Sequence, residues 1–136
     1  MHMACVDRIY RKIEDNADRI AQVEGQFLEG CRNLVVAYGT TTRSAVEAVE
    51  ELRSKGRKDL GFLRLKTLWP VPDATIRSMH PGPIDNIFFP EMNLGYMIHP
   101  IRETLRDRAK NFIPIPCLGQ LHSPDQIIAK IESTLK

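Results

Sequence analysis

The stretch that most constrains the fold of this chain runs from Leu34 to Gly56. It opens with five consecutive apolar residues, 34–38, which end at Gly39. A continuous apolar run of this length is typical of a strand buried on both faces of a parallel sheet. The next residues place apolar side chains at helical spacing, namely Ala45, Val46, Val49 and Leu52. The stretch therefore predicts a buried strand, a tight loop and an amphipathic helix, with Gly56 as its left-handed stop.

The same pattern recurs along the rest of the chain. Further strands are expected over 60–65, 86–89 and 112–117, and helices are expected from Asp73 as N-cap, from Tyr96 to about Lys110, and after Ser123 as N-cap. Strands that alternate with helices predict a parallel α/β sheet with helices on both faces. Proline lacks the N–H that a central strand needs, so the two prolines within 112–117 place that strand at an edge.

The chain before this pattern predicts a leading helix. Apolar residues recur on one face over 1–23, separated by charged residues, and residues 26–29 read as a short extended edge segment. With 136 residues, of which 43% are hydrophobic, the chain has enough apolar material for one globular core. We therefore expect a leading or linker helix over 1–23 and a single domain over 24–136.

Composition excludes several classes of function. A formal net charge of +2 without a basic stripe argues against nucleic acid. The three cysteines are far apart and odd in number, so they predict neither a disulfide framework nor a metal or cluster site and favour a reducing, cytoplasmic setting. Because no apolar run approaches the roughly 18–20 residues of a membrane span, no membrane partner is expected.

The loops that follow the predicted strands are the best candidates for a functional site. In open α/β sheets ligands gather at the carboxyl ends of the strands, so these loops should share one rim. The rim is expected to bind an anion or to form a subunit interface, and its candidate residues are Gly39, Thr40, Thr41, Thr42, Arg43, Trp69, Glu91, Asn93, Gly95 and His122.

Two readings of the loop 39–43 stay open. Hydroxyls and an arginine at a helix N-terminus could cradle an anion, because free N–H groups and the helix dipole point there. The glycine fingerprint of dinucleotide-binding folds and the Gly-Lys-Ser/Thr of a P-loop are both missing. The alternative is that Thr42 or Ser44 serves as the N-cap of the helix.

Glu91, Trp69 and the histidines each have two possible roles. Glu91 could act as an acid or base, or could accept N–H bonds from the following helix. Trp69, next to Pro70, is either a core plug or a partner contact. The histidines 80, 99 and 122 lack metal-ligand spacing, so we expect surface or hydrogen-bonded side chains.

Four segments together resemble one family. They are VVAYGTTTRSA (35–45), LRLKTLWPVP (63–72), PEMNLG (90–95) and GQLHSPDQI (119–127). In this order they resemble the C-terminal domain of the alpha subunit of 2-oxoacid:ferredoxin oxidoreductases, a relative of the transketolase C-terminal domain. Residues 10–17 look like the helix that joins this domain to the preceding one. The chain departs from the family at Tyr96, where relatives often have Gln, and at Gln120, where a second Gly is common.

The resemblance implies a three-layer α/β/α sandwich with a mostly parallel five-stranded sheet, whose one antiparallel strand would be 26–29. It also implies an oligomeric enzyme in which a beta subunit and other domains use thiamine diphosphate, Mg²⁺, an iron–sulfur cluster and coenzyme A to oxidise a 2-oxoacid and reduce ferredoxin. This chain lacks the family's Gly-Asp-Gly…Asn diphosphate motif and a cluster cysteine set. We therefore expect an assembly domain with no catalytic, cofactor-binding or metal-binding residue, inactive alone.

Two alternatives remain at the level of sequence. The first is the C-terminal domain of a transketolase-type or 2-oxoacid dehydrogenase subunit, which shares the fold. The second is a small module that binds an anion or a coenzyme through the rim and Arg43.

Overall fold

The computed structural model describes residues 2–136. It contains, in chain order, α1 (His2–Glu14), α2 (Ala17–Ile20), β1 (Val23–Gln26), β2 (Asn33–Tyr38), α3 (Thr41–Ser54), β3 (Leu60–Leu65), α4 (Asp73–Met79), β4 (Ile84–Glu91), α5 (Ile98–Leu105), β5 (Ala109–Pro116) and α6 (Pro124–Thr134).

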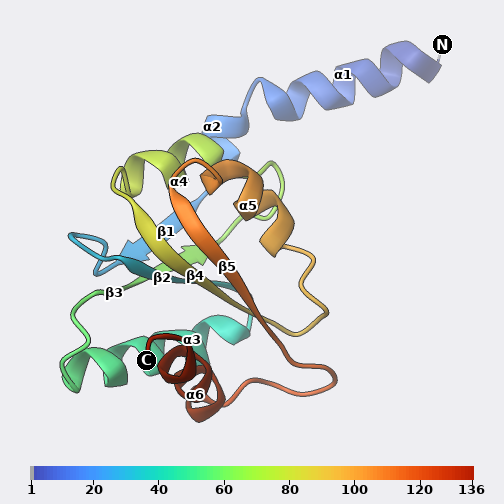
Figure 1. Ribbon diagram of the computed structural model, residues 1–136. Coiled ribbons are helices and arrows are strands. Elements are labelled where there is room, and N and C mark those ends of the chain that lie inside the picture. The colour runs from blue at the N-terminus through green and yellow to red at the C-terminus, as the bar shows by residue number, and fades with distance from the viewer. Residues whose placement is uncertain (1) are drawn as a thin grey trace.

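The strands form one five-stranded sheet in the order β1-β3-β2-β4-β5. β1 is antiparallel to β3, and the other neighbours are parallel. Helices α3 and α6 cover one face, and α4 and α5 cover the other (Figure 1). The predicted three-layer sandwich with one antiparallel strand is confirmed. β5 lies at the edge, as its two prolines predict.

The strand β2 shows why the sheet has two cores. Its apolar side chains alternate between the faces, so that Leu34 and Val36 pack with the α4–α5 layer and Val35 and Ala37 with the α3–α6 layer. All four are essentially inaccessible to solvent. Burial of a large aliphatic side chain contributes about 1.5–3 kcal/mol, so a continuous apolar run is stable only between two layers.

The start of the chain differs from the predicted helix over 1–23. The helix α1 ends at Glu14, and the amide of Asn16 donates to the carbonyl of Lys12 at 2.8 Å, which satisfies an acceptor at the helix end. Val23 belongs to β1 and pairs with Leu65. The antiparallel strand is therefore 23–26 rather than 26–29. Residue 1 lies outside the described residues.

The ends of other helices and strands also differ from the prediction, because tertiary contacts determine them. The fifth helix is 98–105 rather than 96–110, since Ala109 pairs with Ile84 and begins β5. Asp73 is the first residue of α4 rather than its N-cap, and its carboxylate accepts from the hydroxyl of Thr104. The strand that was expected over 86–89 is β4, which extends over 84–91.

The predicted N-cap of α6 is confirmed, whereas the predicted N-cap of α3 is wrong. Thr42 and Ser44 lie inside α3, which begins at Thr41 after Thr40, so neither of them caps the helix. Ser123 does cap α6, in a capping box with Gln126. Gly56 follows α3 at φ +104°, the left-handed stop that was expected.

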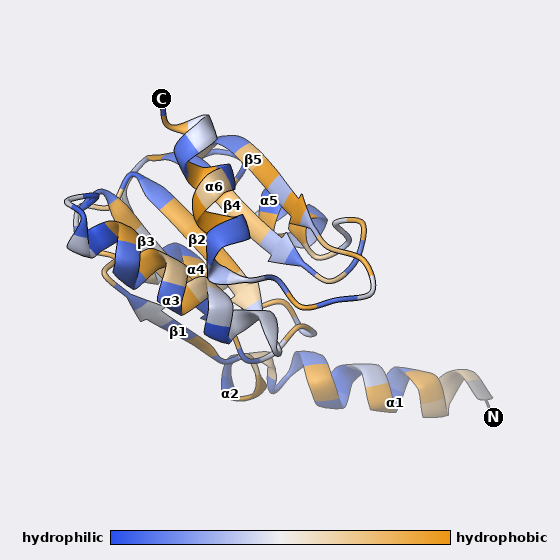
Figure 2. Cartoon of the chain, turned by 90° about the horizontal axis from the view of Figure 1, so that it is seen from below, coloured by the Kyte–Doolittle hydropathy of each residue, from blue (hydrophilic) through white to orange (hydrophobic). Residues whose placement is uncertain are grey.

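The helix α1 extends away from the sandwich (Figure 2). Its apolar side chains are exposed, namely Met3, Val6, Ile9 and Tyr10. Within residues 2–136, no helix is both long enough and apolar enough to cross a membrane.

Candidate functional site

The candidate site is the carboxyl rim, by which we mean the loops that follow β2, β3, β4 and β5. After β2 the chain proceeds to β3 on one side of the sheet and later to β4 on the other, so the strand order reverses between β2 and β4. Their ladder pairs only residues 33–35 with 86–88. The last residues of the two strands, up to Tyr38 and Glu91, are therefore not paired with each other. In open α/β sheets such a reversal is where ligands bind.

A hydrogen-bonded cluster of side chains joins the two strands at this point. One carboxylate oxygen of Glu91, Oε1, accepts from the hydroxyl of Tyr38 at 3.0 Å and from the backbone N–H of Met97 at 3.0 Å. The amide of Asn93 donates to the same oxygen at 3.3 Å and to the Tyr38 hydroxyl at 3.0 Å. Residues of this chain thus occupy the place where related sheets bind ligands.

The environment of Glu91 is nearly closed to solvent. Glu91 is 1% exposed, and its second oxygen, Oε2, has no hydrogen-bond partner among the described residues. Burial first, and then the hydrogen bond to Glu91, raise the pKa of Tyr38, which keeps the phenol a neutral donor. Of the two predicted roles of Glu91, the geometry shows the acceptance of an N–H from the start of the following helix, because Met97 is the N-cap of α5.

The loop between β4 and α5 is ordered by the same cluster. The side-chain oxygen of Asn93 accepts from the N–H groups of Gly95 at 2.7 Å and Tyr96 at 3.1 Å. Gly95 has φ +92°, a conformation that strains any residue with a Cβ. The loop therefore has a defined shape, and it presents Met92, Leu94 and Tyr96 to solvent.

The loop 39–43 is poorly arranged for an anion. The N–H groups of Thr42 and Arg43, which an anion at the helix N-terminus would need, already donate to the carbonyls of Gly39 at 3.3 Å and Thr40 at 3.4 Å. Thr41 and Thr42 are buried, and the Thr42 hydroxyl has no partner among the described residues. Arg43 is exposed.

The two remaining candidates lie apart from this cluster. Trp69 is 58% exposed on the loop after β3, so it is not a core plug. His122 is 3% exposed, and its Nε2 lies 2.7 Å from the carbonyl oxygen of Ile115. A carbonyl can only accept, so Nε2 must donate, and His122 ties the β5–α6 loop to its own strand. The structure thus brings 39–43 and 91–95 together and places Trp69 and His122 on neighbouring loops.

Comparison with known proteins then identifies the family. The family model of the pyruvate:ferredoxin oxidoreductase core domain II matches residues 32–127. This chain belongs to that family. The match includes β2 to β5 and therefore the whole carboxyl rim of this core domain II.

Similar proteins are subunits of 2-oxoacid oxidoreductases. The domain is 32% identical to the 2-oxoglutarate synthase subunit KorA of Methanocaldococcus jannaschii, over 93% of this chain and 33% of that protein. It is 30% identical to KorA of Methanothermobacter marburgensis, over 96% of this chain and 34% of that protein. The chain thus spans about a third of the length of these relatives.

Solved structures share the fold. The domain aligns with a 2-oxoglutarate:ferredoxin oxidoreductase from Magnetococcus marinus, solved with 2-oxoglutarate, coenzyme A and succinyl-CoA bound, at a TM-score of 0.77 and 20% identity, over 99% of this chain and 23% of that chain. A split-gene transketolase, described as an inactive beta4 tetramer, aligns at 0.58 and 15%, over 82% of this chain and 42% of that one. At these identities the likeness concerns the fold alone.

The cysteines of the described residues do not fit an iron–sulfur cluster. These cysteines are free and lie in three separate places: Cys5 is in α1, Cys31 precedes β2, and Cys117 follows β5. Within residues 2–136, no three His, Cys, Asp or Glu side chains are grouped so as to hold a metal ion. An iron–sulfur cluster is held by a set of neighbouring cysteine thiolates, which three separated cysteines do not provide.

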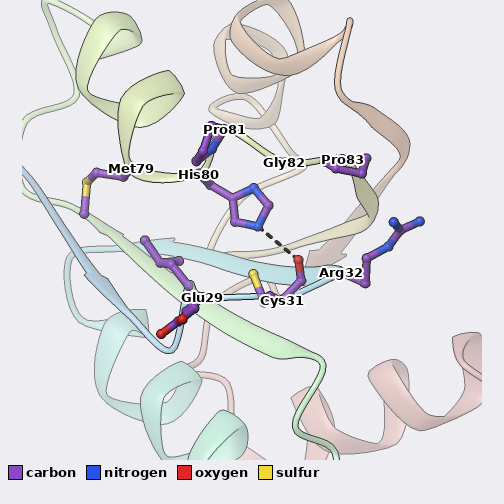
Figure 3. Close-up of a pocket in the computed structure, with 10 residues that line it drawn as sticks. Glu29, Cys31, Arg32, Met79, His80, Pro81, Gly82 and Pro83 are labelled. Carbon is purple, nitrogen blue, oxygen red and sulfur yellow. Dashed lines mark hydrogen bonds between the residues drawn. The ribbon is translucent and has the colours of Figure 1, made fainter.

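A hollow at the end of the sheet opposite the carboxyl rim was not predicted from the sequence. Its volume is about 490 Å³, and it lies between the segments 28–32 and 79–83 at the amino edge, where β2 and β4 begin (Figure 3). Nε2 of the buried His80 lies 3.0 Å from the carbonyl oxygen of Cys31, and burial raises the pKa of the Cys31 thiol to about 11. The thiol is therefore neutral and unreactive at physiological pH. Residues 31 and 80 are 49 positions apart, so no local sequence pattern indicates that they meet.

Proposed function

We propose that this chain is an assembly domain, without catalytic residues of its own, in the alpha subunit of a thiamine diphosphate-dependent 2-oxoacid:ferredoxin oxidoreductase of the cytoplasm. The observation that supports this most is the alignment with KorA subunits, which uses 93–96% of this chain and only about a third of theirs. About two thirds of a KorA subunit lies outside the aligned region, and we assign the catalytic and cofactor-binding residues to that part and to the beta subunit.

In the proposed holoenzyme the other domains and the beta subunit would hold thiamine diphosphate, Mg²⁺, the iron–sulfur cluster and coenzyme A. The enzyme would oxidise a 2-oxoacid to an acyl-coenzyme A and pass the electrons to ferredoxin. The similar proteins include 2-oxoglutarate synthase subunits and a ketoisovalerate oxidoreductase subunit, VorB, which is 37% identical over 93 residues. The substrate class is therefore a 2-oxoacid, and the acid itself would be selected outside this chain.

The leading segment would connect this domain to the rest of the subunit. Because Val23 belongs to the sheet, we move the proposed boundary to just after α2, at Ile20. The exposed apolar residues of α1 would then pack on the neighbouring domain, as an amphipathic helix requires.

The test is reconstitution. The chain is produced alone and, separately, together with the coding regions that complete a subunit of KorA length and with the beta subunit of the same genome. We expect no 2-oxoacid-dependent reduction of a viologen dye by the chain alone, activity in the full complex, and loss of assembly or activity when this chain is omitted. Turnover by the pure chain would refute the proposal.

A further inference from the structure

The large exposed apolar side chains gather in two parts of the described chain. Six lie on the carboxyl rim with exposed fractions between 41% and 68%, namely Trp69, Met92, Leu94, Tyr96, Leu118 and Leu121. Five others lie in α1 and α2. The remaining one, Phe27, has the guanidinium of Arg53 over its ring at 4.4 Å. Scattered apolar residues are normal on a surface, but a concentration at one edge indicates an interaction site.

The six side chains belong to loops that begin close together. They follow β3, β4 and β5, which with β2 are neighbours in the sheet. Adjacent strands lie about 4.8 Å apart, so the four strand ends span about 14 Å. A stable protein interface covers about 800 Å² on each partner, which is wide enough to include all of these loops at once.

The loops that display these side chains are held in place. Asn93 and Glu91 bind the backbone between β4 and α5, and His122, in the loop that contains Leu118 and Leu121, binds the carbonyl of Ile115 in β5. The hydroxyl of Thr40 contacts the sulfur of Met92 at 3.5 Å, which fixes the loop before α3 beside the one after β4. Loops that are ordered before binding lose less entropy when a partner docks, so this construction suits an interface.

The charge of the rim defines the partner further. Arg43 is exposed and takes part in none of the ion pairs among the described residues, whereas Glu91 and His122 are buried. Lys66, at the end of β3, is already paired with Glu24. A partner that covers this rim must therefore be apolar and should place a carboxylate opposite Arg43, because an unpaired charge in an interface is unfavourable.

We infer that the carboxyl rim docks an apolar protein surface with one carboxylate facing Arg43, located on the part of the oxidoreductase that lies outside this chain. The inference rests on the proposed function. About two thirds of a KorA-length subunit lies beyond the aligned region, and this remainder is large enough to contain the partner surface.

The experiment measures binding of the tagged chain to the coproduced remainder of the subunit with its beta subunit. We expect Trp69→Ala and Leu94→Asp each to weaken binding about thirty-fold or more, the effect of losing an interface hot spot. Phe27→Ala removes an exposed aromatic ring at the opposite edge and is the matched control, with binding expected within about three-fold of the unmodified chain. Far-ultraviolet circular dichroism and urea unfolding establish that each variant is folded.

Each outcome decides a separate question. If the unmodified chain binds and the folded rim variants bind equally well, the inference is overturned and the proposed function stands. If the unmodified chain does not bind, both are refuted. If sedimentation shows that the chain alone forms a dimer that Leu94→Asp dissociates, the rim is a contact between copies, which also overturns the inference. A loss of association rate in Arg43→Glu that disappears at high salt would support the partner carboxylate.

Discussion

The two ends of the parallel strands, the amino edge and the carboxyl edge of the sheet, each contain a polar network. The networks differ in what surrounds them. At the amino edge a row of amides crosses three neighbouring strands. The Asn111 amide donates to Asn86 at 3.1 Å, the Asn86 amide donates to Asn33 at 2.8 Å, and the Asn33 amide donates to the carboxylate of Asp59 at 2.6 Å. Register places the three asparagines directly opposite one another. A strand slipped by one residue would lose its own bonds in this row, so the row favours the observed register.

Ion pairs surround the amino-edge row. The carboxylate of Asp85 binds the guanidinium of Arg32 through two bonds of 2.8 and 2.9 Å and the ammonium group of Lys110 at 2.6 Å. These groups are partly exposed, and they interact favourably with water as well as with one another. The charged groups of this edge are therefore satisfied by one another and by water, without a protein partner.

The carboxyl edge has the opposite character. Its network centres on one buried carboxylate, of which a single oxygen accepts all the bonds, and its loops expose apolar side chains. The two networks therefore lie beneath surfaces of different character. The amino-edge row aligns strands beneath a hydrated surface, whereas the Glu91 cluster shapes loops with exposed apolar side chains, for which we propose a protein partner.

The largest expected effect on stability is at Glu91. Glu91→Ala leaves the N–H of Met97 and the hydroxyl of Tyr38 without this acceptor and opens a cavity, so we expect a loss of about 2–4 kcal/mol in the free energy of unfolding, measured by urea denaturation. Glu91→Gln is the matched control, because it keeps the volume and one acceptor oxygen, and it should lose about 1 kcal/mol. An alanine variant as stable as the parent would mean that the cluster does not hold the rim.

A smaller effect is expected at the centre of the amino-edge row. Asn86→Ala removes the bonds to Asn33 and Asn111 and should cost about 1–2 kcal/mol, because the site is only partly buried and water replaces some of the lost partners. Asn111→Ala, at the exposed end, is the control and should cost about 0.5 kcal/mol. Equal losses at the two positions would argue that the row does not act as a connected network.

The fold was predictable from the sequence wherever local rules decide it. Apolar runs such as 34–38 identify strands buried on both faces, prolines 114 and 116 force an edge position, and Ser123 with Gln126 forms its capping box within four residues. Each of these signals operates over a few residues. The family resemblance is confirmed by the match over 32–127.

The errors arose where distant segments decide the structure. The first strand is 23–26 because it pairs with β3, and α5 stops early because Ala109 pairs with Ile84. The central bond of the rim joins Tyr38 to Glu91, which are 53 residues apart, and His80 meets Cys31 across 49 residues. The rim could be located from the ends of the strands, and Glu91 and Asn93 were among its candidate residues, but their hydrogen bonds to Tyr38 could not be foreseen. Its use in binding remains a prediction.

The smallest expected effect concerns acid and separates the two edges by their charges. Hydrogen bonds from Arg32, and then from Lys110, hold the pKa of Asp85 well below its ordinary value. A depressed native pKa stabilises the fold above the unfolded value of about 4, and that stability is lost as the pH falls below it. The urea midpoint of the parent chain should therefore fall more between pH 5 and pH 3 than that of Asp85→Asn, so that the two curves converge in acid. Asp7→Asn, on the projecting α1, is the control and should follow the parent. Parallel curves for the parent and Asp85→Asn would show that the ion pairs at the amino edge add nothing to stability, and the contrast between the edges would then rest on the asparagine row and the apolar loops alone.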